Sequence, residues 1–163
     1  MPQPRGNAKG LGHVNAKKMF EYTMQHGGGT FAPLGSPINP SFGFAISLDP
    51  DRTEVVPMIE FSPSRCEKYA MNNLAYVNEY NSEHAVPAMG LKMFGTWVHE
   101  GNVHLDVSTV IVTKDINKIM AMAADADQIC VYDFATSKAV DVAAFYQKEC
   151  DIEVEAESEA QRE

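Results

Sequence analysis

The sequence predicts a single α+β domain whose sheet has the split β-α-β arrangement of ferredoxin-like folds, with two helices on one face. Residues 91–112 alternate apolar and polar side chains on both sides of a Gly-Asn pair, as in a β-hairpin. A segment of helical periodicity lies on each side of this hairpin, and a further strand pattern flanks each helix. The resulting order of strand, helix, strand, strand, helix and strand is that of split β-α-β folds, and a different α+β sheet with extra edge strands is the alternative.

The N-terminal part of the chain predicts a flexible end, a helix, a loop and a strand. Residues 1–14 contain prolines, glycines and lysines and are expected to be flexible. Residues 15–26 predict a short helix that begins at an Asn15 N-cap and ends at a triple glycine. Three prolines predict a loop at residues 30–41, and alternation of apolar with small residues predicts a strand at 42–48.

A turn and a short edge strand should follow. Residues 49–52 read Asp-Pro-Asp-Arg, a composition typical of turns. With Glu54 they resemble half of a calcium-binding loop, but the glycine and the terminal glutamate at fixed spacing are missing. Residues 55–59 are expected to form a short edge strand interrupted by a proline.

The strongest helix signal lies at residues 62–80. Ser62 is expected to be its N-cap and Pro63 its first residue. Asn72 and Asn73 are poor helix formers in its middle. We expect them to make polar contacts with a neighbouring loop, with a ligand contact as the less favoured alternative.

The hairpin is the centre of the predicted fold. If its two-residue turn is Gly101-Asn102, Trp97 pairs with Asp106 and His99 pairs with His104. Strand alternation then places aromatic and polar side chains together on one face of the hairpin. These residues, joined by Tyr132 from the strand predicted at 128–133, form the candidate binding site: Trp97, His99, His104, Asp106, Ser108 and Tyr132. A shift of the register by one residue would exchange the two faces.

The C-terminal part predicts a helix at residues 115–127, the strand at 128–133 and a turn at 135–138. Residues 140–142 either form a short strand or begin a last helix. Residues 149–163 contain seven acidic residues and one arginine, and they predict a disordered acidic tail. The folded domain is therefore expected to span residues 15–148.

Bulk composition excludes several classes of protein. The net charge is −9, and residues 1–148 are nearly neutral with 15 acidic and 12 basic residues, so direct nucleic-acid binding is not expected. No apolar run is long enough for a membrane span, and the N-terminus lacks the apolar stretch of a signal peptide. Three widely spaced cysteines form no metal-ligand pair or disulfide framework, which favours the cytoplasm.

The candidate face carries no catalytic signature. His99, His104 and Asp106 offer ligands for a divalent metal, but any hairpin with this alternation places such a trio on one face. Ser108, His104 and Asp106 are not expected to form a catalytic triad. Neighbours on one face of a strand lie roughly 7 Å apart, which is too far for the hydrogen bond between a nucleophile and its base. The sequence therefore assigns no catalytic residue, no metal and no cofactor.

Short phrases spread over residues 27–142 resemble a group of small uncharacterised proteins carried by actinobacterial phages and other mobile elements. They read GTW at 95–97, VHLDVS at 103–108 and QICVYD at 128–133, with GGTF at 28–31 and GFAIS at 43–47. In that group a G-T-W, an L-D-V-S and a Q-I-A-x-Y-D strand recur, and Cys130 stands where alanine is usual. The resemblance implies a phage or mobile-element setting and brings no activity with it.

The function expected from these observations is that of a non-enzymatic accessory protein, from a phage or mobile element, that binds a protein partner. The absence of a catalytic signature in the sequence, the short chain and the acidic tail favour this interpretation. Two alternatives stay open: a small metal-binding domain or enzyme that uses His99, His104 and Asp106, and a structural component of a virion or assembly.

Overall fold

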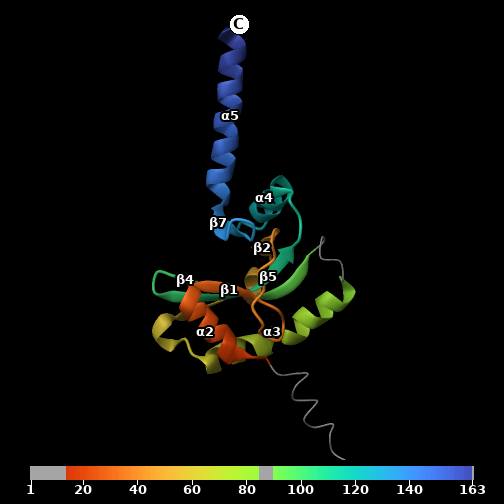
Figure 1. The fold of residues 1–163 in the computed structure, drawn as a ribbon, viewed down its shortest axis with the longest axis vertical. Helices are drawn as coiled ribbons and strands as arrows, with labels where there is room; N and C mark the ends of the chain where they lie inside the picture. The colour runs from red at the N-terminus through yellow and green to blue at the C-terminus, as the bar shows by residue number, and fades with distance from the viewer. Residues whose placement is uncertain (1–13, 85–89, 163) are drawn as a thin grey trace, which may run out of the picture.

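The computed structural model describes residues 14–84 and 90–162, with side chains through residue 156, and shows an α+β protein (Figure 1). Within these residues, four α-helices and seven strands follow one another with two short 3₁₀ turns, η1 and η2. In chain order these elements are α2 (Ala16–His26), β1 (Gly28–Phe31), β2 (Phe44–Ser47), η1 (Pro50–Arg52), β3 (Glu54–Pro57), η2 (Met58–Glu60), α3 (Pro63–Glu83), β4 (Leu91–His99), β5 (Asn102–Ile111), α4 (Ile116–Asp125), β6 (Cys130–Asp133), β7 (Lys138–Asp141) and α5 (Val142–Arg162).

The strands form one antiparallel sheet around the β4–β5 hairpin. The order is β1-β4-β5-β2-β6-β7, and β3 also pairs with β5. Both β2 and β3 use the edge of β5 that faces away from β4: β2 pairs with residues 108–111 and β3 with residues 102–105. The chain leaves the sheet between β2 and β3, and this excursion contains the predicted turn at residues 49–52.

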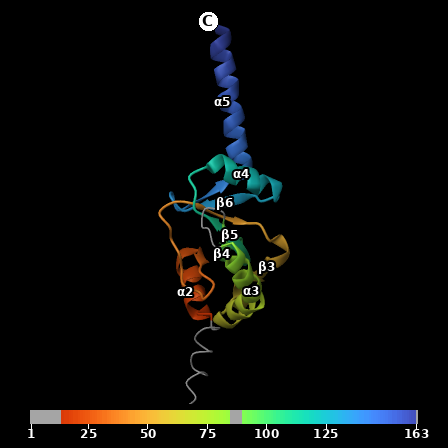
Figure 2. The same cartoon turned by 90° about the vertical axis from the view of Figure 1, so that its right-hand side faces the viewer.

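Helices α2, α3 and α4 pack on the apolar face of this sheet. Val107 of β5 belongs to the core that includes Tyr69 of α3 and Met19 of α2, whereas Ile111 packs with Ile119 of α4. Because Val107 and Ile111 are four residues apart on one strand, their side chains lie on the same side of it. Figures 1 and 2 show α2 and α3 together at one end of the body, with α4 at the other end beside the base of α5.

Local signals located the helix starts. Asn15 accepts a hydrogen bond from the backbone N–H of Lys18, and Ser62 accepts one from that of Arg65. Both N-caps were predicted, and so was the left-handed cap at Gly27. Helix α3 continues to Glu83, three residues beyond its predicted end, and residues 85–89, between α3 and β4, lie outside the described part of the chain.

One strand was missed at the N-terminal side. Residues 28–31 were assigned to the glycine cap and the loop, but they form β1 and pair with β4. A Cβ atom on Gly28 would lie 2.7 Å from the carbonyl oxygen of Thr96, so glycine permits the close approach of the two backbones. The predicted flexible terminus lies outside the described residues except for Val14, which is buried in the core.

The C-terminal segment differs most from its prediction. Strand β7 ends at Asp141, and a 21-residue helix, α5, begins at Val142. The expected disorder of residues 149–163 is therefore wrong for residues 149–162, which are helical. Glutamate, alanine and glutamine are strong helix formers and supply most of this segment. Both views show α5 projecting away from the sheet (Figures 1 and 2).

No helix within residues 14–84 and 90–162 has both the length and the apolar character needed to cross a lipid bilayer.

Candidate functional site

The turn of the hairpin lies one residue earlier than predicted. Glu100 and Gly101 form it, both at positive φ (49° and 79°), and His99 pairs with Asn102 across it. Positive φ at both central residues defines a type I′ turn. Strand β3 favours this position of the turn, because Pro57 pairs with Asn102 and so holds Asn102 within the strand ladder.

This correction changes the pairs but not the faces. Trp97 faces His104 instead of Asp106, and Val98 faces Val103 instead of Leu105. The partner of each residue moves by two positions along β5, and two positions restore the same side of a strand. Trp97, His104, Asp106 and Ser108 therefore share one face as predicted, although not in the predicted rows.

Three of the predicted residues form an exposed aromatic cluster. The ring centroids of Trp97 and His99 lie 4.7 Å apart with 20° between the planes, and His104 lies 5.5 Å from Trp97. Trp97 is 42% exposed, and Val55, which faces His104 from β3, is 54% exposed. We call Trp97, His99, His104 and Val55 the Trp97 patch.

Asp106 and Ser108 form a separate polar pair deeper on the same face. The Ser108 hydroxyl donates a hydrogen bond of 2.6 Å to Asp106 Oδ1. Gly95 faces Asp106 across the hairpin, and a Cβ atom on Gly95 would overlap both Asp106 Oδ1 and Ser108 Oγ. Burial raises the pKa of the Asp106 carboxyl, and the Ser108 hydrogen bond and the charge of His104 partly oppose that rise.

Tyr132 lies on the same face but does not join the patch. It pairs with Ala45, which in turn faces Val110 of β5. Val110 is six residues from His104, or roughly 20 Å along the strand. Between them the face is covered by a small core of Ala45, Val110 and Phe134, against which Ile38 and Met93 pack. This small core thus covers part of the sheet face, and the Trp97 and Tyr132 side chains lie exposed outside it.

The described residues do not bring together the three possible ligands of the alternative metal-binding interpretation. His99, His104 and Asp106 belong to three different rows of the hairpin, and Asp106 is already bonded to Ser108. Among residues 14–84 and 90–162, no group of three or more histidine, cysteine, aspartate or glutamate side chains is arranged to hold a metal ion. The patch offers aromatic rings and an apolar side chain at the surface.

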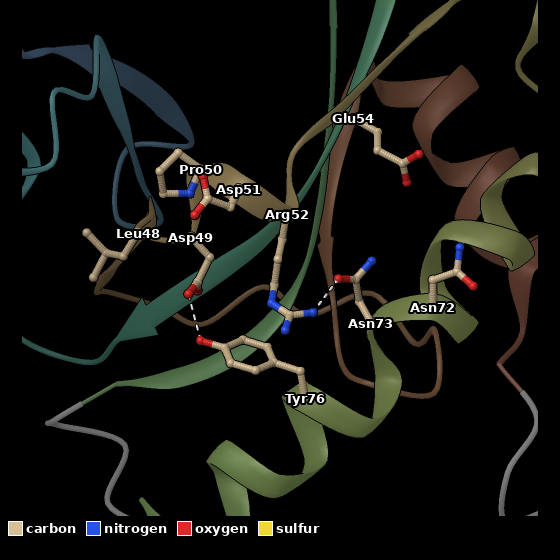
Figure 3. Close-up of a pocket in the computed structure, with 9 residues that line it drawn as sticks. All are labelled: Leu48, Asp49, Pro50, Asp51, Arg52, Glu54, Asn72, Asn73 and Tyr76. Atoms are coloured by element: carbon tan, nitrogen blue, oxygen red, sulfur yellow. Dashed lines mark hydrogen bonds between the residues drawn. The ribbon is translucent and has the colours of Figure 1, made fainter.

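A second region, which the sequence signalled only in pieces, lies on the other side of β5. The chain excursion between β2 and β3 and the middle of α3 line an open, polar pocket of about 650 Å³ (Figure 3). The excursion contributes the predicted turn, and α3 contributes Asn72 and Asn73 together with Tyr76. The expected contact between the asparagines and a neighbouring loop is present, because Arg52 donates a hydrogen bond of 2.9 Å to Asn73 Oδ1.

Asp49, which lines this pocket, forms an ion pair with Lys92. Lys92 of β4 is almost fully buried, and its Nζ lies 2.8 Å from Asp49 Oδ2 and 2.7 Å from Thr109 Oγ1. Asp49 Oδ2 accepts no well-aligned hydrogen bond, so the charge of Lys92 is what compensates its burial. The other oxygen, Oδ1, accepts a 2.6 Å hydrogen bond from Tyr76, and burial together with this bond raises the pKa of Tyr76 to about 12.

The structure combines an α+β fold with two surface features, the Trp97 patch and the polar pocket. Searches against protein families, curated proteins and solved structures found no match to this chain.

Proposed function

We propose that this protein is a non-enzymatic accessory protein that binds a protein partner through the Trp97 patch. The observation that carries this proposal is the exposure of Trp97, stacked with His99 and His104 on a sheet face that is partly covered by the small core around Phe134. Tryptophan supplies large, rigid contact area and is enriched among the residues that dominate binding energy at protein interfaces. The patch is an exposed surface of the sheet, and such a surface suits contact with another protein.

The charge of the chain supports a protein partner with basic groups. The net charge is −9, and residues 149–163 alone contribute −6. This charge opposes contact with nucleic-acid phosphates and favours encounter with a positively charged protein. One concrete form of the proposal is a cytoplasmic phage or mobile-element protein that binds a basic host protein, a setting implied by the sequence resemblance.

We also propose that the fold is an elaborated ferredoxin-like one. The strands β4, β5, β2 and β6 lie side by side in that order, which is compatible with a split β-α-β sheet. In this description β1, β3 and β7 are additions, and α2 and α5 precede and follow the shared elements. A solved structure with another strand order would remove this assignment.

The proposed function is tested by partner capture with matched variants. Trp97→Ala should abolish recovery of the partner, because it removes the central ring of the patch. Tyr132→Ala is the matched control, since Tyr132 is an aromatic residue on the same face with similar exposure, 37% against 42%, outside the patch. A partner recovered from lysate is then measured against both purified variants by calorimetry. Equal affinity of the Trp97→Ala variant and the parent would overturn the proposal.

A further inference from the structure

Arg52 is held in position by uncharged groups. Its Cζ lies 3.7 Å from the centroid of the Tyr76 ring, and its Nη1 donates to Asn73 Oδ1 at 2.9 Å. Asn73 is itself fixed, because its Nδ2 donates to the backbone oxygen of Tyr69. The Tyr69 hydroxyl completes the arrangement with a 2.7 Å hydrogen bond to the backbone oxygen of Arg52. The guanidinium therefore has a defined orientation before any ligand arrives.

Two of the three carboxylates that line the pocket, Asp49 and Glu54, have other partners, and the third, Asp51, is exposed to solvent. Asp49 is paired with Lys92 and with the Tyr76 hydroxyl, and Glu54 is paired with Arg65 at 2.8 Å. Arg52 makes no ion pair with any side chain in the described part of the protein. It thus carries a positive charge that its surroundings orient without neutralising.

Arg52 lines the pocket of about 650 Å³ between the β2–β3 excursion and α3, which is within the usual size range of small-molecule sites (Figure 3). Nη1 is used by Asn73, and the planar guanidinium has further N–H donors for a second acceptor. Such a fork matches the two oxygens of a carboxylate or a phosphate group. Asn72 lies on the same wall and offers an amide for further hydrogen bonds.

From this geometry we infer that the pocket between the β2–β3 excursion and α3 is a binding site for a small oxyanion, a carboxylate or a phosphate, which Arg52 recognises. This site is separate from the Trp97 patch, and it does not depend on the proposed function. Its ligand is a small molecule or anion. Asn73 and Tyr76 position Arg52, and this positioning distinguishes Arg52 from a lysine on the protein surface.

The inference is tested by calorimetric titration of the full chain with two probes, inorganic phosphate and malonate, at low ionic strength. Arg52→Gln should abolish binding of the probe that the parent binds, and Arg52→Lys, which keeps the charge but loses the fork, should weaken it at least about tenfold. Lys17→Gln is the charge-matched control on the exposed surface of α2 and should bind as the parent does. Circular dichroism establishes that each variant is folded.

The two probes separate the two kinds of ligand. Binding of phosphate alone identifies a phosphate site, and binding of malonate alone or of both identifies a carboxylate or a general oxyanion site. If the parent binds neither probe at millimolar concentration, the inference is wrong. It is also wrong if Arg52→Lys and Lys17→Gln bind as the parent does, because the attraction is then nonspecific charge.

Discussion

Gly95 is the residue on which the arrangement of Asp106 and Ser108 depends. Its missing side chain leaves room for the hydrogen-bonded pair that lies across β4. Gly95→Ala is expected to destabilise the protein by about 1–3 kcal/mol, because the new methyl group must displace two partly or fully buried polar atoms. Urea denaturation followed by fluorescence of the single tryptophan measures the change.

A double variant distinguishes this collision from a general effect of alanine in the strand. Asp106→Ala opens the space that the Gly95 methyl group would occupy. The combined variant should therefore be more stable than the sum of the two single changes predicts. Simple additivity would show that Gly95 and Asp106 do not compete for the same space.

Asp106 should make the stability depend on pH. Burial raises the pKa of its carboxyl, so the folded state holds the proton more tightly than the unfolded state does. Its contribution is most favourable below the unfolded pKa of about 4 and is lost as the pH rises through the folded pKa. Asp106→Asn keeps an acceptor for Ser108 and removes this loss, so the variant should gain stability over the parent as the pH rises. Denaturation curves between acidic and neutral pH test this, and a constant difference would contradict it.

At the scale of elements, Lys92 joins β4 to the excursion between β2 and β3. Its ammonium group is buried against Asp49, and its backbone is clamped by Asn81 of α3, which both donates to and accepts from it. Lys92→Met should cost roughly 3 kcal/mol, because it leaves Asp49 buried without its countercharge. Chemical denaturation of the variant gives this value.

Asp49→Asn in the Lys92→Met background tests the origin of that cost. Removing the orphaned charge should recover a substantial part of the lost stability, since an ion pair replaced as a whole costs much less than a broken one. No recovery would mean that the loss came from the contact of the ammonium group with the Tyr80 ring, whose centroid lies 4.7 Å from Lys92 Nζ, rather than from the orphaned charge of Asp49.

At the scale of the whole molecule, α5 is the part that the body stabilises least. Val142 and Phe145 pack into the core beside α4, and the Asp141 carboxylate accepts a hydrogen bond from the N–H of Ala144. The side chains described beyond Phe145, residues 146–156, are all exposed. A helix without tertiary contacts is marginally stable in water, so this one depends on its anchored first turn.

A chain that ends at Lys148 should therefore keep the stability of the body within about 0.5 kcal/mol, since it loses only exposed side chains. Its net charge changes from −9 to −3, because residues 149–163 carry −6. Thermal unfolding of the β-sheet signal and the loss of helical ellipticity measure the two effects separately. A clearly destabilised body would show that α5 contributes to the core.

The sequence by itself determined the alternation of the hairpin and the N-caps of its helices, because both depend on neighbours a few residues away. The face shared by Trp97, His104, Asp106 and Ser108 was predicted correctly even though the turn was misplaced by one residue, since the pairing moved by two positions. Asn15 and Ser62 were recognised for a similar reason: a cap bonds to an N–H three residues away.

Only the tertiary structure decided the features that depend on contacts between distant segments. The pairing of β3 with β5 holds Asn102 in the ladder, and the small core around Phe134 covers part of the face while leaving Trp97 exposed. The pocket brings Arg52 next to Asn73. The sequence indicated the turn that contains Arg52 and the asparagine in mid-helix separately, but it could not show that they meet, because their side chains come together only after α3 packs on the sheet. Local patterns specify conformation over a few residues, whereas the choice of partners is made by the packing of the whole chain.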